Sequence, residues 1–399
     1  MGTVIEDAAL VYAFAAVTMI FLQSTRTSTT TPEDAEKTLL SDLIHRGLVA
    51  YRASETHLNS KIPSSIGELH VTVKQIMTCM FLDMAMLSTG LINRGFVMLR
   101  EAIVLLQTLK VNRATAPPHE IARCQRLYWD CFLHERFLFI ISSRRSAILP
   151  PLRSGLPLLD PTIPPNIDAG FGRLVELFCV IDNTFIYCWG GNDVQEENDN
   201  SDYFSLCCQR PGIPDLTADW VEQKQAELDA EECKTAELMD SLTELQHVDI
   251  FITRLWLRTL IWQLALSRGL LRSAPPQTAH EGLSLHFPAD RLSAQLRGLV
   301  CRLQSATSIA THGSGMLQKL FEITTTIADV LALPFPPGQQ GLETAQHRRM
   351  DDFVFLVRFL FKFDKVQPKE RRYIRDRLDA LRTIYGYEGA DLTLESGSD

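Results

Sequence analysis

Apolar residues recur at intervals of three and four along almost the whole chain, the spacing that gathers side chains on one face of an α-helix. No segment shows the clear alternation of apolar and polar residues that a half-buried strand requires. Proline and glycine interrupt the pattern and leave between them blocks that are long enough to be helices. The sequence therefore predicts an all-α fold, an irregular array of about a dozen helices joined by long proline-rich loops.

Local signals place several of these elements. Pro32 and Pro368 stand where the first turn of a helix tolerates proline, so we expect helices to begin beside them. Six prolines between residues 149 and 168 predict a long ordered loop, followed by a helix over residues 171–189. The polar and acidic segment 190–202 predicts a flexible surface loop.

Composition limits the environment and the partners of the chain. The formal net charge is −9, so the chain as a whole is not attracted to the phosphates of nucleic acids. The nine cysteines are odd in number and lie in apolar stretches, which predicts reduced, buried thiols. No Asn-x-Ser/Thr acceptor site occurs. These features predict an intracellular protein.

The most apolar segment runs from Ala8 to Leu22, fifteen residues without a charge. A membrane-spanning helix needs about 20 such residues. Acidic residues precede the segment and Gln23 follows it, so we expect a buried helix and no membrane association.

Motifs for nucleotide or metal chemistry fail at defined positions. There is no Gly-x-x-x-x-Gly-Lys-Ser/Thr loop, and His134-Glu135 is not followed by the second histidine of a zinc-binding helix. Cys124 and Cys131 lie seven residues apart on one helix face, a common arrangement for small core residues, and no Cys-x-x-Cys pair occurs. The sequence predicts no catalytic residue, no metal ligand and no cofactor.

One acidic pair keeps an enzymatic alternative open. Asp351 and Asp352 begin like the motif with which all-helical isoprenoid enzymes bind magnesium diphosphate, but Phe355 occupies the third carboxylate position. We interpret the pair as first-turn acids of a buried helix, and the alternative is an all-α magnesium-dependent enzyme of isoprenoid type. The basic stretch 362–377 is interrupted by acids and predicts a solvated, salt-bridged helix face.

Two segments carry a family resemblance. Residues 94–111 contain an Arg-Glu-Ala-Ile run, and residues 122–136 contain Tyr-Trp-x-x-Phe-x-x-Glu-Arg, with a proline-bearing loop after them. Together they resemble the middle homology region of fungal zinc-cluster transcription factors. The residues that carry the resemblance, with a structural role, are Arg100, Glu101, Tyr128, Trp129, Phe132, Glu135 and Arg136.

The resemblance implies a helical regulatory domain over residues 1–270, a C-terminal helical part over 271–389 packed on it, and a disordered tail over 390–399. It implies a nuclear regulator or co-regulator of fungal metabolic or secondary-metabolite genes, not an enzyme. The expected partners are other transcription regulators or co-regulators and a small-molecule effector. The sequence lacks the family's cysteine cluster, so we expect DNA binding to be indirect or to depend on a missing N-terminal zinc cluster.

The second motif also makes a prediction about charge. Arg136 carries a fixed charge into a mostly apolar helix, where it needs a partner. We expect Glu101 or Glu135 to pair with Arg136 or Arg126.

Overall fold

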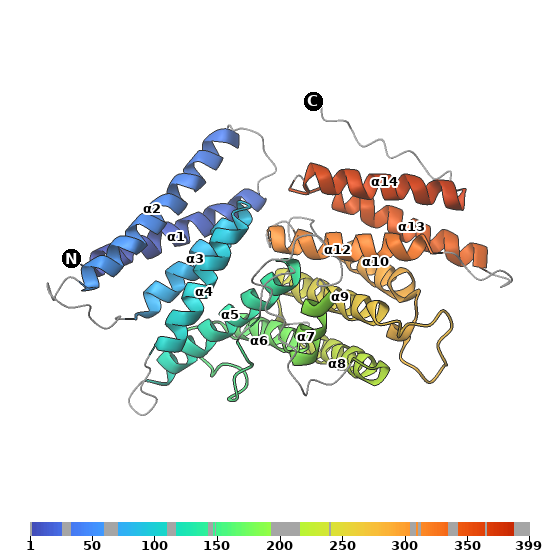
Figure 1. Cartoon of the computed structure of the whole chain (residues 1–399), viewed down its shortest axis with the longest axis horizontal. Coiled ribbons are helices and arrows are strands. Elements are labelled where there is room, and N and C mark those ends of the chain that lie inside the picture. The colour runs from blue at the N-terminus through green and yellow to red at the C-terminus, as the bar shows by residue number, and fades with distance from the viewer. Residues whose placement is uncertain are drawn as a thin grey trace. The chain divides into compact units, whose positions relative to one another are not determined.

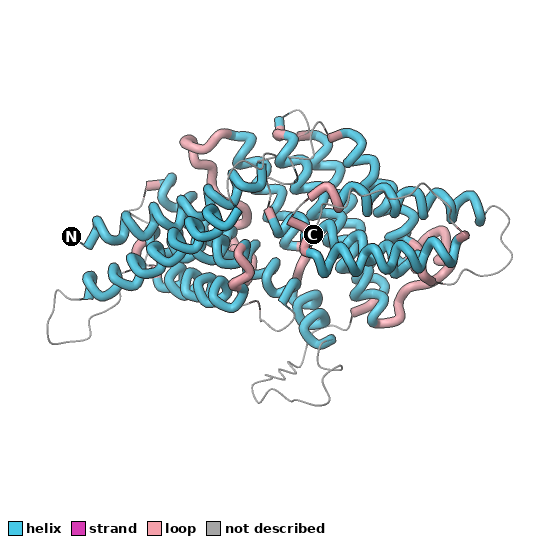
Figure 2. Tube along the Cα trace, turned by 90° about the horizontal axis from the view of Figure 1, so that it is seen from above, coloured by secondary structure: helices cyan, strands magenta, loops and turns pink. Residues whose placement is uncertain are grey.

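The computed structural model describes residues 2–25, 33–59, 71–109, 117–142, 147, 149–192, 216–238, 241–303, 309, 313–333, 342–363 and 365–386. Within these ranges the chain is helical, with connecting loops and no strand (Figure 2). The all-α prediction is therefore confirmed. The predicted tail 390–399 and most of the predicted loop 190–202 lie outside the described residues.

The helices follow one another along the chain as labelled in Figure 1. They are α1 (Gly2–Thr25), α2 (Glu33–Asn59), α3 (Val73–Ser88), α4 (Ile92–Thr108), α5 (Pro118–Ser142), α6 (Pro165–Cys179), α7 (Asn183–Asn192), α8 (Ala218–Glu237), α9 (Glu244–Ser267), α10 (Ser293–Arg302), α12 (Ser314–Leu331), α13 (Leu342–Leu360) and α14 (Pro368–Tyr385). A short 3₁₀ turn, η3 (Glu281–Leu283), and a π-turn, η4 (Pro288–Leu292), lie between α9 and α10.

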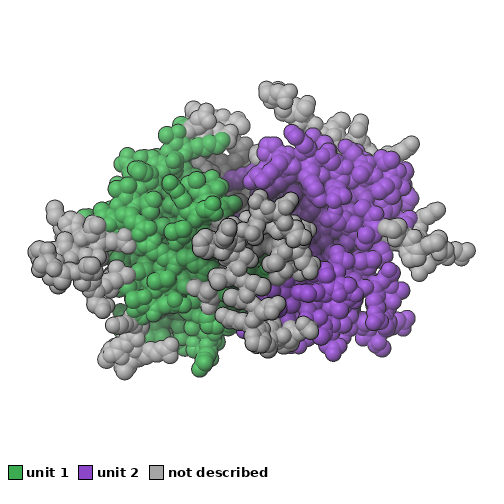
Figure 3. Space-filling model, viewed as in Figure 1, with its two compact units in different colours: residues 1–181, 189–205 green, residues 182–188, 206–399 purple. Residues whose placement is uncertain are grey.

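The chain forms two compact units (Figure 3). Unit 1 comprises residues 1–181 and 189–205, and unit 2 comprises residues 182–188 and 206–399. The boundary predicted near residue 270 lies inside unit 2, because α9 before it packs against α10 and α12 after it.

Unit 1 is built on the helix pairs α1–α2, α1–α3 and α3–α4, with α5 packed on α4 and α6 on α5. Helix α3 begins at a capping box in which Thr72 and Gln75 satisfy each other's backbone N–H groups. The turn into α4 passes through Gly90, whose φ of 79° suits glycine. Local signals of this kind determine where these helices begin and end.

Helix α1 is buried on one face only. Ala9, Ala13 and Ala16 are buried, whereas Val11 and Phe14 are exposed. Among the described helices, α1 is the one whose length and composition would allow it to cross a membrane, although core helices and signal sequences meet the same criteria.

Unit 2 is organised around α9. Most of its side chains are buried, including Trp256 and Trp262, and it contacts α8, η3, α10 and α12. Helices α13 and α14 pack on α12. The indole N–H of Trp262 donates to Ser284 O at 2.9 Å, which ties the loop after α9 back onto the helix. Helix α9 is thus the buried central helix of unit 2.

The segment around residues 149–189 differs from its prediction in two places. Helix α6 begins at Pro165, within the stretch predicted to be irregular, because proline at the first helical position loses no hydrogen bond. The single helix predicted over 171–189 is two helices, since Asp182 accepts a hydrogen bond from Phe185 N at 2.9 Å and caps α7.

Candidate functional site

The motif residues of the second segment lie on α5, on the side that faces the proline-rich loop (residues 149–164). Trp129 and Phe132 are buried and their rings meet edge to face, with centroids 4.9 Å apart. The guanidinium of Arg136 lies 3.4 Å from the centroid of the Phe132 ring. These three side chains form a continuous aromatic and cationic cluster in the core of unit 1.

Four side chains of α5 hold the main chain of the proline-rich loop. Tyr128 Oη donates to Pro150 O at 2.7 Å, and Trp129 Nε1 donates to Gly155 O at 3.1 Å. At Leu149 the backbone N–H donates to Glu135 Oε2 at 2.8 Å, while the carbonyl accepts from Arg136 at 2.9 Å. Because all four contacts are to backbone atoms, α5 holds this part of the loop through its main chain.

A second group of contacts secures the far end of the loop. Arg123 Nε donates to Asp160 Oδ2 at 2.9 Å, and both the backbone N–H and the hydroxyl of Thr162 donate to Asp160 Oδ1. These hydrogen bonds, first those from Thr162 and then that from Arg123, lower the pKa of Asp160 to about 2. Gln125 Oε1 also accepts from Leu158 N at 2.9 Å. The loop is therefore anchored along its length.

The ion pairs differ from those predicted for Arg136 and Arg126. Glu101 accepts from Arg52 at 2.8 and 3.0 Å and from the Tyr51 hydroxyl at 2.8 Å, so its predicted pairing with either arginine is wrong. Glu135 pairs instead with Arg100 of α4.

Arg126 pairs with Asp168 at the start of α6. Arg136 is satisfied by main-chain carbonyls, those of Leu149 and Ile181, rather than by a carboxylate. Burial lowers the pKa of Arg136 to about 10, so it stays charged at neutral pH. Helix packing, not separation along the chain, decides which partner each arginine meets.

An acidic cluster that the sequence analysis missed adjoins this network. Asp83 is fully buried on α3, and its Oδ2 lies 3.1 Å from His134 Nδ1. Burial raises the pKa of Asp83 and of Asp130, which precedes His134 by one turn of α5. Burial alone would lower the pKa of His134, but Asp83 and Asp130 outweigh it and raise this pKa. The sequence signal for this cluster was Asp83, a charged residue inside the apolar run of α3.

Three leucines of the proline-rich loop were also missed. Leu156, Leu158 and Leu159, here called the leucine patch, are exposed between the anchored positions Gly155 and Asp160. Leu159 is 80% exposed. The sequence signal for this patch was the presence of leucines among the prolines of the loop. Their exposure could not be predicted, because it depends on how α5 holds the loop.

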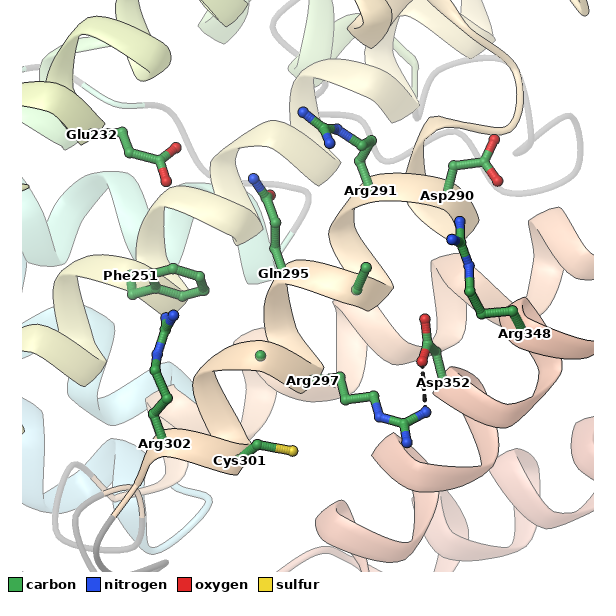
Figure 4. Close-up of a pocket in the computed structure, with 12 residues that line it drawn as sticks. Glu232, Phe251, Asp290, Arg291, Gln295, Arg297, Cys301, Arg302, Arg348 and Asp352 are labelled. Atoms are coloured by element: carbon green, nitrogen blue, oxygen red, sulfur yellow. Dashed lines mark hydrogen bonds and ion pairs between the residues drawn. The ribbon is translucent and has the colours of Figure 1, made fainter. Parts of the chain in front are cut away.

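In unit 2 a pocket of about 700 Å³ opens beside α10 and α13 (Figure 4). Its lining includes Asp352, which is buried and pairs with Arg297 at 2.7 Å. The neighbouring Asp351 is exposed. The two carboxylates of the isoprenoid-type motif therefore do not face a common point. Within the described part of the chain, no three His, Cys, Asp or Glu side chains are grouped to hold a metal ion.

The basic stretch 362–377 caps a helix as well as facing solvent. Arg371 donates to the carbonyls of Phe361 and Phe363 at 3.0 and 2.6 Å, which satisfies groups at the end of α13. Arg377 pairs with Asp329 of α12 at 3.1 Å. The predicted salt-bridged face on α14 is thus partly a contact between helices.

No family model, no curated protein and no solved structure matches this chain. Function is therefore inferred from the residues and contacts of the chain itself.

Proposed function

We propose that this chain is a non-catalytic regulator or co-regulator of fungal transcription, active in the nucleus on metabolic or secondary-metabolite genes. It acts by binding partner proteins, and its contact with DNA is indirect. The resemblance of residues 94–111 and 122–136 to the fungal regulatory region motivates this proposal. The observation that carries it is the leucine patch, presented on a loop that α5 holds by its backbone.

The motif residues support a scaffolding role because their polar atoms are engaged by the protein itself. The hydroxyl of Tyr128, the indole N–H of Trp129 and the carboxylate of Glu135 all contact the loop backbone. A catalytic group must instead reach a substrate in an accessible site. These side chains therefore serve to fix the loop.

The leucine patch suits recognition of a partner protein. Loops held on a rigid scaffold commonly carry binding residues, because their exposed side chains are pre-positioned and lose little freedom on binding. Leu156, Leu158 and Leu159 offer apolar side chains within four consecutive positions, at a place where the loop is anchored on both sides. An apolar surface of a second regulator or co-regulator would cover them.

A tethering experiment tests the proposal. The chain is fused to an unrelated DNA-binding domain and expressed in a fungal nucleus with a reporter gene under the matching operator. We expect the fusion to change reporter output at least threefold. Leu158→Glu combined with Leu159→Glu should abolish the change, whereas Ile384→Glu, at an exposed position on α14, should preserve it.

Equal reporter output with and without the fused chain would refute the regulatory role. Full activity of the double leucine variant would refute the role of the leucine patch. Circular dichroism of the purified variants shows that each is folded.

A salt series on the purified chain tests indirect DNA contact. Phosphate-driven binding weakens steeply as salt rises. We expect no binding to duplex DNA between 50 and 200 mM salt, the range over which such contacts lose most affinity. Sequence-specific binding that survives 200 mM salt would contradict indirect contact, since the chain would then read DNA itself.

A further inference from the structure

The pocket of unit 2 is large enough for a small molecule. It holds about 700 Å³ and is formed by residues from α8, α9, η4, α10 and α13. Pockets for small ligands commonly measure about 300–1,000 Å³.

The carboxylates of the pocket are already neutralised by arginines. Asp352 pairs with Arg297 at 2.7 Å. Glu232 pairs with the buried Arg254 at 3.3 Å. The third acid of the lining, Asp290, pairs with Arg349 of α13. None of these carboxylates is left to compensate a further cation.

Two arginines of the pocket remain available. Arg302 and Arg348 are exposed, and neither has a hydrogen-bond or ion-pair partner within the described part of the chain. Figure 4 shows Arg302 on the side of Phe251 and Arg348 on the side of Asp352. Two free guanidinium groups therefore face a pocket whose acids are paired, in a chain with a net charge of −9. Guanidinium groups bind carboxylate and phosphate in bidentate geometry.

The remaining walls suit the organic part of a ligand. Phe251 contributes an aromatic ring. A Cβ added at Gly298 would meet no atom within 4 Å. Glycine inside a helix is less stable than alanine. Gly298 thus leaves the pocket open where a side chain could stand.

We propose that this pocket binds a small organic anion that carries a carboxylate or phosphate group. Arg302 and Arg348 hold the anionic group or groups, and Phe251 contacts the organic part. The proposal rests on the pocket alone and goes beyond the proposed function, since partner binding by unit 1 does not require it.

Two thiols that the sequence predicted to be buried are exposed, and they provide the assay. Cys301 lines the pocket, whereas Cys233 of α8 is exposed but does not line it. The purified full chain is treated with iodoacetamide at constant ionic strength, and mass spectrometry follows alkylation of each cysteine. Citrate probes for a carboxylate ligand, pyrophosphate for a phosphate ligand, and glucose serves as a neutral molecule.

We expect citrate or pyrophosphate at 10 mM to slow alkylation of Cys301 at least threefold and to leave Cys233 unchanged, and glucose to affect neither. Arg302→Ala with Arg348→Ala should abolish this protection. Arg375→Ala, which removes an exposed arginine of α14 outside the pocket, should retain it. For each variant, protection is the ratio of the Cys301 alkylation rates without and with the anion. This ratio cancels any change that the substitution makes in the intrinsic reactivity of Cys301.

Gly298→Leu gives an independent variant, because a Cβ at this position meets no atom within 4 Å and the larger side chain adds bulk to the pocket lining. It should reduce the protection of Cys301 at least threefold while the melting temperature does not fall. The proposal would be overturned if neither citrate nor pyrophosphate protected Cys301, or if Cys233 were protected equally. It would also be overturned if the double arginine variant kept the full protection of Cys301. None of these results depends on a transcription reporter, so failure here is distinct from failure of the proposed function.

Discussion

The contact of Glu135 with Arg100 and Leu149 makes a quantitative prediction for Glu135→Gln. The carboxylate is 1% exposed, and it accepts one bond from Arg100 and one from Leu149 N at 2.8 Å. Glutamine keeps the shape but removes the charge and turns one acceptor into a donor. A hydrogen bond to a charged group contributes about 1.5–3 kcal/mol, so replacing one of the two should cost about 2–3 kcal/mol.

The exposure of Arg100 sets the upper limit of this cost. Breaking a fully buried ion pair costs about 3–5 kcal/mol because a charge is left without water or partner. The Arg100 side chain is 22% exposed, so it regains part of its hydration and the cost falls below that range. For a unit of this size, 2–3 kcal/mol corresponds to a fall of roughly 4–12 °C in melting temperature.

Urea denaturation followed by circular dichroism measures the free energy of unfolding. Glu120→Gln is the matched control, because Glu120 lies exposed on the same helix and should change stability by less than about 0.5 kcal/mol. Proteolysis within residues 149–164 should accelerate in Glu135→Gln only. If Glu135→Gln unfolds within about 0.5 kcal/mol of the unchanged chain, the charge of Glu135 does not hold the loop, and this reasoning is refuted.

Three further predictions follow from single contacts. Although burial opposes it, the hydrogen bond with Asp83 raises the pKa of His134 above its ordinary 6.5, so the folded state binds this proton more tightly. This contribution is complete below pH 6.5 and is lost as pH rises through the folded pKa. The melting temperature of the unchanged chain, relative to that of His134→Gln, should therefore fall as pH rises above 6.5, and parallel curves would contradict this prediction. Tyr128→Phe should lower the free energy of unfolding by about 0.5–1.5 kcal/mol and expose the loop to protease, because it removes the hydrogen bond to Pro150 O. Unchanged stability and unchanged proteolysis would show that this hydrogen bond does not hold the loop. Gly298→Ala should stabilise α10 by up to about 1 kcal/mol, because alanine is a better helix former than glycine. Gly386→Ala should destabilise the end of α14 by about 1–2 kcal/mol, because Gly386 has a φ of 58°. Equal effects of the two variants in urea denaturation would show that backbone conformation is not the cause.

Helices were predictable where local chemistry defines them. The proline at the start of α14 and the apolar periodicity of α9 depend on residues within one or two turns of each other, so a single sequence contains the information. The break at Asp182 was missed because an Asp cap that directly follows the apolar residues Val180 and Ile181 resembles an ordinary helix residue. The start of α6 was missed because prolines were counted as breakers without regard to their position in a first turn.

The sequence by itself determined the all-α class, most of the helices and the need of Arg136 for a partner, since propensity, periodicity and buried charge are properties of short segments. Tertiary structure decided which groups meet. Glu135 pairs with Arg100, thirty-five residues away, because α4 packs on α5. The pocket draws its lining from residues between Glu232 and Asp352, and the exposure of the leucine patch depends on α5 holding the loop. Long-range pairing of this kind arises from helix packing, which no local pattern records.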